Sequence, residues 1–185
     1  MSDEKVSGVA VWRITEYDLK GNVISDRELK NLIVNSGRTR QFQNLLGLSA
    51  SGSFVAMAVG ASTTAAQVTD TRLTYELIGN PTRKPLTNTS GAALSASDIN
   101  TATQIIVINA SSSATFYQNI SVQATYNSGD LNNGNQFGEY ALASTAVLPG
   151  TPTSTSGVIY NHLIDPNPIQ KSAANAINVV CTVWY

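Results

Sequence analysis

Short apolar or alternating runs occupy most of the chain, separated by clusters of Gly, Ser, Thr, Asn and Pro. This pattern predicts an antiparallel, jelly-roll-like β-sandwich, because such folds are built from short strands joined by turns. The alternation is clearest in residues 176–185, where Ile177, Val179 and Cys181 share one face. The strands expected are 54–59, 72–78, 103–109, 114–126, 136–145, 157–164 and 176–185.

The N-terminal segment predicts a β-hairpin over residues 6–30. Its first strand is marked by recurrent apolar residues: Val9, Val11, Ile14 and Tyr17. Lys20-Gly21-Asn22 supplies turn chemistry before a second apolar stretch begins. Thirteen of the chain's charged residues lie in residues 1–40. The charged hairpin of residues 1–30 is therefore expected to face water or to dock against a neighbouring protein.

One short helix is expected near residues 37–46. Asn35 and Ser36 can cap its N-terminus, and Gly47 stands where a C-terminal glycine belongs. The apolar residues at helical spacing are Phe42, Leu45 and Leu46. Arg38 and Arg40 fall in the first turn, where the helix dipole disfavours cations. Two interpretations stay open: an acidic neighbour or partner holds these arginines, or they are exposed and have no role.

The predicted loops are long and rich in Ser, Thr and Asn. Two of them exceed the roughly 12–15 residues usual within a compact domain, so they are either functional or ordered by a neighbouring chain. Prolines at four positions stiffen two of the loops: Pro149, Pro152, Pro166 and Pro168.

Length and charge narrow the class of protein. The 185 residues suit a single domain spanning residues 1–185. Only 12% of residues are charged and the net charge is −1, so no basic patch is expected to attract nucleic acid. The apolar runs are too short to cross a bilayer, and the N-terminus lacks the apolar run of a signal peptide. Synthesis in a cytoplasm is expected, without membrane attachment.

The inventory of reactive side chains argues against catalysis. The chain holds one histidine, His162, and one cysteine, Cys181, which excludes most metal and nucleophilic sites. Cys181 is expected to be a small buried residue. His162 with nearby Asp165 suggests a metal site or an acid/base pair, but a strand-end histidine bonded to a loop is favoured. No spacing singles out two carboxylates for glycoside hydrolysis. No catalytic, cofactor-binding or metal-binding residue is predicted.

Three motifs follow one another in the first half of the chain: Asn31-Leu-Ile-Val-Asn-Ser-Gly37, then Val55-Ala-Met-Ala-Val-Gly60 with Ala-Ser-Thr-Thr-Ala-Ala66, then Asp70-Thr-Arg-Leu-Thr-Tyr-Glu76. Their order resembles a family of small structural proteins of tailed bacteriophages. Phe137-Gly-Glu-Tyr-Ala-Leu142 and Ile169-Gln-Lys171 resemble the family's later segments. Ala61 departs from the pattern, because the family usually has a second glycine there.

The resemblance implies a non-enzymatic virion protein, made in the host bacterial cytoplasm, that assembles with copies of itself and with other virion proteins. Its place would be the tail, baseplate, collar or fibre region, or alternatively the capsid, as a decoration or head-fibre base protein. An alternative of another class is a module that binds host surface glycans through exposed aromatic residues. An enzyme ranks third. The candidate assembly residues are Arg38, Arg40, Gly60, Asp70, Glu76 and Glu139.

Overall fold

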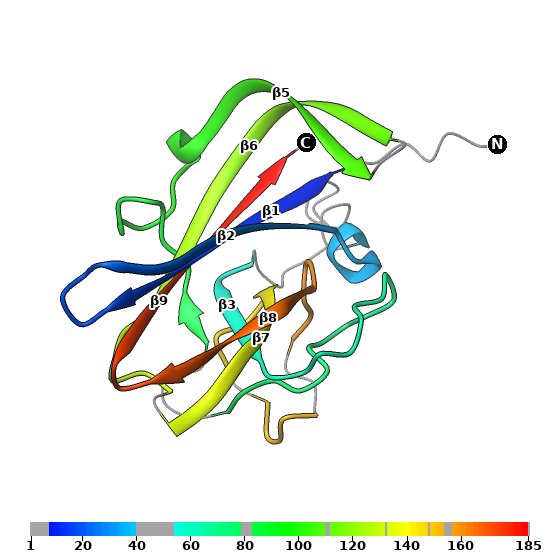
Figure 1. Ribbon diagram of the computed structural model, residues 1–185. Coiled ribbons are helices and arrows are strands. Elements are labelled where there is room, and N and C mark those ends of the chain that lie inside the picture. Colours follow the sequence, from blue (N-terminus) through cyan, green and yellow to red (C-terminus); the bar gives the residue numbers. More distant parts are fainter. Residues whose placement is uncertain are drawn as a thin grey trace.

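The computed structural model describes residues 8–39, 54–78, 83–109, 112–131, 133–147, 149–153 and 157–184. Two antiparallel sheets stack face to face and enclose one main hydrophobic core (Figure 1). The chain is therefore a mainly-β protein with the architecture of an antiparallel β-sandwich, as the sequence predicts.

Within the described residues the larger sheet has five strands. Their order is β2 (Val23–Leu32), β1 (Val9–Asp18), β9 (Asn175–Trp184), β6 (Ser112–Tyr126) and β5 (Ile99–Asn109). The alternation predicted for the last strand is confirmed, because Ile177, Val179 and Cys181 are fully buried. The N-terminal hairpin is also confirmed, as β1 and β2 pair around a turn in which Gly21 has a positive φ of 85°.

The smaller sheet, which carries the site described below, has four strands in the part of the chain that the structure describes. Their order is β4 (Lys84–Pro85), β3 (Ala56–Gly60), β7 (Asn133–Ala143) and β8 (Leu163–Ser172). Every residue of β3 is buried. Met57 and Val59 face the main core, whereas Ala58 belongs to a second cluster on the outer face of the sheet. The continuous apolar run in the sequence thus reflects a strand that is covered on both faces.

The second cluster forms because irregular segments cross the outer face of the smaller sheet. It joins residues from the segments before β3, after β3 and before β8: Val34, Leu73 and Ile159 with Ala58, Ala141 and Ala143. The predictions of strands over 72–78 and 157–164 are wrong for most of both ranges. The first segment makes one isolated bridge, Glu76 with Gly60. The second makes two, Ile159 with Ala143 and Asn161 with Ile33, and only its end enters β8.

Two other expectations are modified. Pro166 and Pro168 lie within the edge strand β8 rather than in a loop. Of the predicted helix, residues 35–39 show that helical structure begins two residues earlier than expected, and residues 40–46 lie outside the described residues. A short 3-10 helix, η1 (Ala96–Asp98), precedes β5.

Candidate functional site

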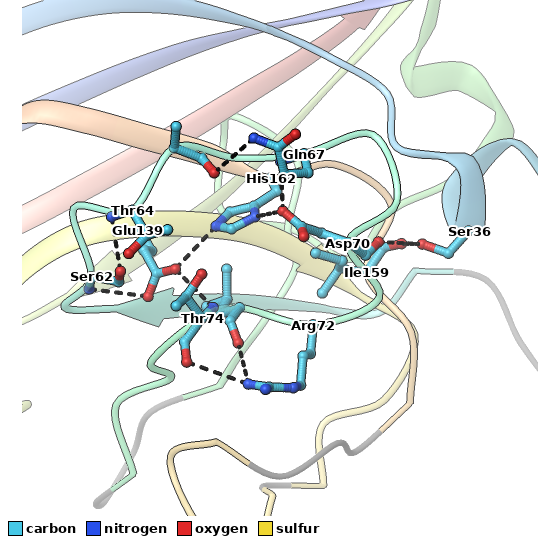
Figure 2. Close-up of polar contacts among 12 residues, drawn as sticks. Ser36, Ser62, Thr64, Gln67, Asp70, Arg72, Thr74, Glu139, Ile159 and His162 are labelled. Carbon is cyan, nitrogen blue, oxygen red and sulfur yellow. Dashed lines mark hydrogen bonds and ion pairs between the residues drawn. The ribbon is translucent and has the colours of Figure 1, made fainter.

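A buried carboxylate, Glu139, organises the outer face of the smaller sheet. Glu139 lies in β7 directly opposite Gly60 in β3, and its side chain is 0% exposed. Its two carboxylate oxygens accept hydrogen bonds from three backbone N–H groups of the segment after β3: Ser62 at 3.1 Å, Thr74 at 2.8 Å and Tyr75 at 2.9 Å. Glu139 therefore holds both ends of the loop over residues 61–75 against the sheet (Figure 2).

Gly60 leaves the space that this carboxylate occupies. A Cβ built on Gly60 would overlap the Glu139 carboxylate and would lie 2.6 Å from the backbone oxygen of Tyr75. Any side chain at this position would displace either the carboxylate or the loop. A glycine at position 60 is thus required by a close approach, and its φ is not positive.

The chain's one histidine lies between Glu139 and a second carboxylate. His162 Nε2 is 3.0 Å from Glu139 Oε1, and His162 Nδ1 is 2.7 Å from Asp70 Oδ2 (Figure 2). The His162 side chain is 0% exposed. Because carboxylates accept and do not donate, both ring nitrogens must carry protons for both contacts to be hydrogen bonds. The geometry therefore favours the imidazolium form.

The shifts in pKa agree with this ionised arrangement. Burial acts to lower the pKa of His162, but the hydrogen bonds to Glu139 and Asp70 outweigh it and raise the pKa above its ordinary value. Burial acts to raise the pKa of Glu139, but the bonds from His162 and from three amides outweigh it and lower the pKa. Each group thus favours the charged form of the other.

Asp70 extends the network to the start of the helix. Its carboxylate accepts the backbone N–H of Gln67 at 2.7 Å, besides contacting His162. The hydroxyl of Ser36 lies 2.8 Å from the backbone oxygen of Ile159 and 3.2 Å from that of Asp70. The network consequently joins the helix start, the loop after β3, β7 and the segment before β8.

A separate buried ion pair holds the next part of the same segment. Arg83 Nε and Nη2 bind the carboxylate of Glu76 at 2.7 and 2.9 Å, and both side chains are 2% exposed. Arg83 Nη1 donates to the backbone oxygens of Thr145 and Val147 at 2.9 and 3.0 Å. This pair connects the segment around Glu76 to the segment after β7.

The arrangement fixes loops, and among the described residues His162 bonds to carboxylates rather than to a nucleophile. A catalytic histidine of the serine-hydrolase type directs one ring nitrogen at a nucleophile and the other at a carboxylate. In this site both nitrogens face carboxylates, and the ring is buried. Among the described residues, no group of three or more Asp, Glu, His and Cys side chains is arranged to hold a metal ion.

The structure brings together some of the residues singled out by the sequence and separates others. Asp70 and Glu139 meet at His162, and Gly60 lies against Glu139. Glu76 belongs to the separate pair with Arg83. Arg38 is half-buried, and its Nε has no hydrogen-bond partner among the described residues. Arg40 lies outside those residues.

His162 is a strand-end histidine bonded to a loop, as the sequence favours, but not through Asp165. That carboxylate instead binds Arg27 of β2, across the side of the sandwich. Sequence reasoning did not identify Arg83, although its spacing of seven residues from Glu76 is a weak signal.

The stability of the protein is expected to depend on pH through His162. A raised folded-state pKa contributes stability that is complete below the unfolded pKa, about 6.5, and is lost as pH rises through the folded pKa. Over that interval, urea denaturation should show the free energy of unfolding falling by about 1.4 kcal/mol per pH unit.

The matched variant for this measurement is His162→Gln, which removes the chain's one histidine. It should be less stable than the parent at pH 6 and should show a flat profile from about pH 6 to 8, where other side chains seldom titrate. An equal slope in both proteins would assign the pH dependence to another group.

No protein-family model, curated protein or solved structure matches the chain. No helix in the part of the chain that the structure describes is long and apolar enough to cross a membrane.

Proposed function

We propose that the chain is a non-enzymatic structural protein of a tailed-bacteriophage virion, located in the tail, baseplate or collar region. It is made in the host bacterial cytoplasm and assembles with copies of itself and with an adjacent virion protein. The motifs that resemble the phage family support this proposal. In the fold, residues of these motifs hold loop segments in place.

The observation that carries the proposal is how three carboxylates are bound within the chain. Asp70, Glu76 and Glu139 each bind a cation or an imidazole within the chain, and each holds an irregular segment in place. Loops fixed before contact lose less conformational entropy when a neighbour docks on them. Such loops suit a protein that assembles with neighbours, because they present a surface of fixed shape to a binding partner.

The glycan-binding alternative finds less support. It depends on exposed aromatic side chains, but Trp12, Tyr126, Tyr140 and Tyr160 are buried at 0 to 3% exposure. Tyr75, at 47%, is the largely exposed aromatic among the side chains that the structure describes. A single exposed ring is a small platform for stacking on a sugar.

Gold-labelled antibody against the chain, imaged on intact virions of the phage that encodes it, tests the proposal. We expect label at the tail tip, fibres or neck, and none after the antibody is absorbed with purified protein. Label over the whole head would support instead a capsid decoration or head-fibre base protein. Virions without label would contradict a structural role and would favour the glycan-binding alternative.

A further inference from the structure

The two sheets end in four edge strands, β2 and β5 in the larger sheet and β4 and β8 in the smaller one. An edge strand presents unpaired backbone N–H and C=O groups that can pair with another chain. Monomeric proteins prevent this with very short strands, charged residues or prolines on the edge. The four edges can therefore be compared by the protection that each one carries.

Three of the edges are protected. β4 has two residues, one of them a proline. β8 contains Pro166 and Pro168, which cannot donate backbone hydrogen bonds. β2 carries four charged residues: Asp26, Arg27, Glu28 and Lys30. Each of these features opposes pairing with a further strand.

The fourth edge, β5, has none of these three features, although its pairing with β6 shifts register between Thr101 and Gln104 and between Val107 and Asn109, and such irregularities are a partial protection. Its 11 residues, Ile99–Asn109, include neither a charged residue nor a proline. Its paired neighbour β6 is also uncharged throughout Ser112–Tyr126. β5 pairs with β6 on one side, and no described strand or bridge pairs with its outer side. By length, charge and proline content, β5 is the least protected edge among the described residues.

The β5–β6 hairpin also extends beyond the rest of its sheet. β9 pairs with β6 only from Asn119, which lies opposite Trp184, to Tyr126. Residues 112–118 of β6 therefore have β5 as their strand partner in the described chain. Figure 1 shows this part of the hairpin as an arm that reaches past the C-terminal end of β9. A two-stranded arm of this kind is marginally stable alone.

We infer that the outer edge of β5 pairs antiparallel with β5 of a second copy, across a two-fold axis, so that the larger sheets of two copies become continuous. A two-fold interface places the same edge on both sides. An uncharged edge can face itself without like-charge repulsion, whereas β2 would bring its own carboxylates together. A second copy is also present wherever the chain is made, so this partner is always available to the edge. This inference deepens the proposed assembly role by naming the partner and the surface.

The test uses two sets of substitutions at polar positions of β5. One set is Thr101→Lys, Thr103→Lys and Asn109→Lys, and the other places Glu at the same three positions. The full-length wild type should be a dimer or a higher oligomer by light scattering over a range of concentrations. Each set alone should raise the dissociation constant about tenfold or more, because like charges then face each other across the interface. Mixing the two sets should restore association.

The matched control places three lysines on the tip of the N-terminal hairpin, at the exposed residues Leu19, Val23 and Ile24. It adds the same charge and should leave the oligomer intact. A monomeric wild type, an unchanged oligomer in the lysine set, or loss of the oligomer in the control would overturn the inference. Failure of the mixture to associate would show that β5 does not pair with its own copy. None of these results alters the virion labelling, which tests the proposed function independently.

Discussion

Replacing Glu139 with alanine should lower the free energy of unfolding by about 3–5 kcal/mol, the cost of breaking a buried charge pair. The variant leaves His162 with one carboxylate instead of two, and it leaves the amides of Ser62, Thr74 and Tyr75 without their acceptor. For a chain of this length the midpoint of thermal unfolding should fall by about 10 °C. Calorimetry measures the midpoint, and urea denaturation measures the free energy.

Hydrogen exchange separates this loss from general destabilisation. The amides of Ser62, Thr74 and Tyr75 should lose protection in Glu139→Ala under conditions where amides in the middle of β9 keep theirs, because the loop opens before the sheet does. Glu139→Gln should fall between the parent and the alanine variant, since the amide oxygen can still accept while its NH2 group faces donors. Glu28→Ala, which removes an exposed glutamate of β2, should change stability by less than about 0.5 kcal/mol. If Glu28→Ala and Glu139→Ala had the same free energy of unfolding, the buried network would not contribute to stability.

Strand patterns were predictable where one face of a strand is buried along its whole length. β9 is such a strand, and its alternation identifies the inward face correctly. In β1 the residues that face the main core are Ala10, Trp12 and Ile14, and of the apolar residues that mark this strand in the sequence only Ile14 is among them. Val9 is buried as well, so the period of two is blurred at the start of the strand. The hairpin itself was still predictable, because turn chemistry at Gly21 does not depend on that period.

Residues covering the outer face of the smaller sheet could not be assigned from the sequence. Leu73 and Ile159 are buried, as residues of a strand would be, but they lie in irregular segments packed on Ala58 and Ala141. A short apolar run does not distinguish these cases. Pro166 and Pro168 favoured a loop where the structure has the strand β8. Prolines are accepted there because the outer N–H groups of an edge strand need no partner.

Several residues of the site were predictable from the sequence, but the contacts between them were not. A buried glutamate in an otherwise uncharged stretch needs a partner, and the structure gives Glu139 one within the chain. The partner, His162, is 23 residues away along the chain, and its second carboxylate, Asp70, is 92 residues away from it. Only the stacking of the crossing segments on β3 and β7 brings the three together. Nearness in sequence favoured Asp165 instead.

The glycine that ends the first motif, Gly37, should also prove indispensable, although helix propensity predicts the opposite. Gly37 is helical, and replacing a helical glycine with alanine ordinarily stabilises by up to about 1 kcal/mol. A Cβ at Gly37 would overlap the backbone oxygen of Tyr160 and lie 2.8 Å from its Cα and carbonyl carbon. Val34 donates its backbone N–H to the same Tyr160 oxygen at 3.1 Å, so the two segments have little room to separate.

Gly37→Ala should therefore lower the free energy of unfolding by about 3 kcal/mol, the cost of overpacking against groups that cannot move aside. Gly129→Ala is the matched control, because a Cβ there meets nothing within 4 Å and φ at Gly129 is not positive. Urea denaturation should show the control as stable as the parent or slightly more stable. A stabilised Gly37→Ala would mean that the helix start moves freely against Tyr160. In that case the contact of Ser36 with Ile159 and Asp70 would not fix the loop, and the rigidity on which the assembly proposal rests would be lost at this end of the network.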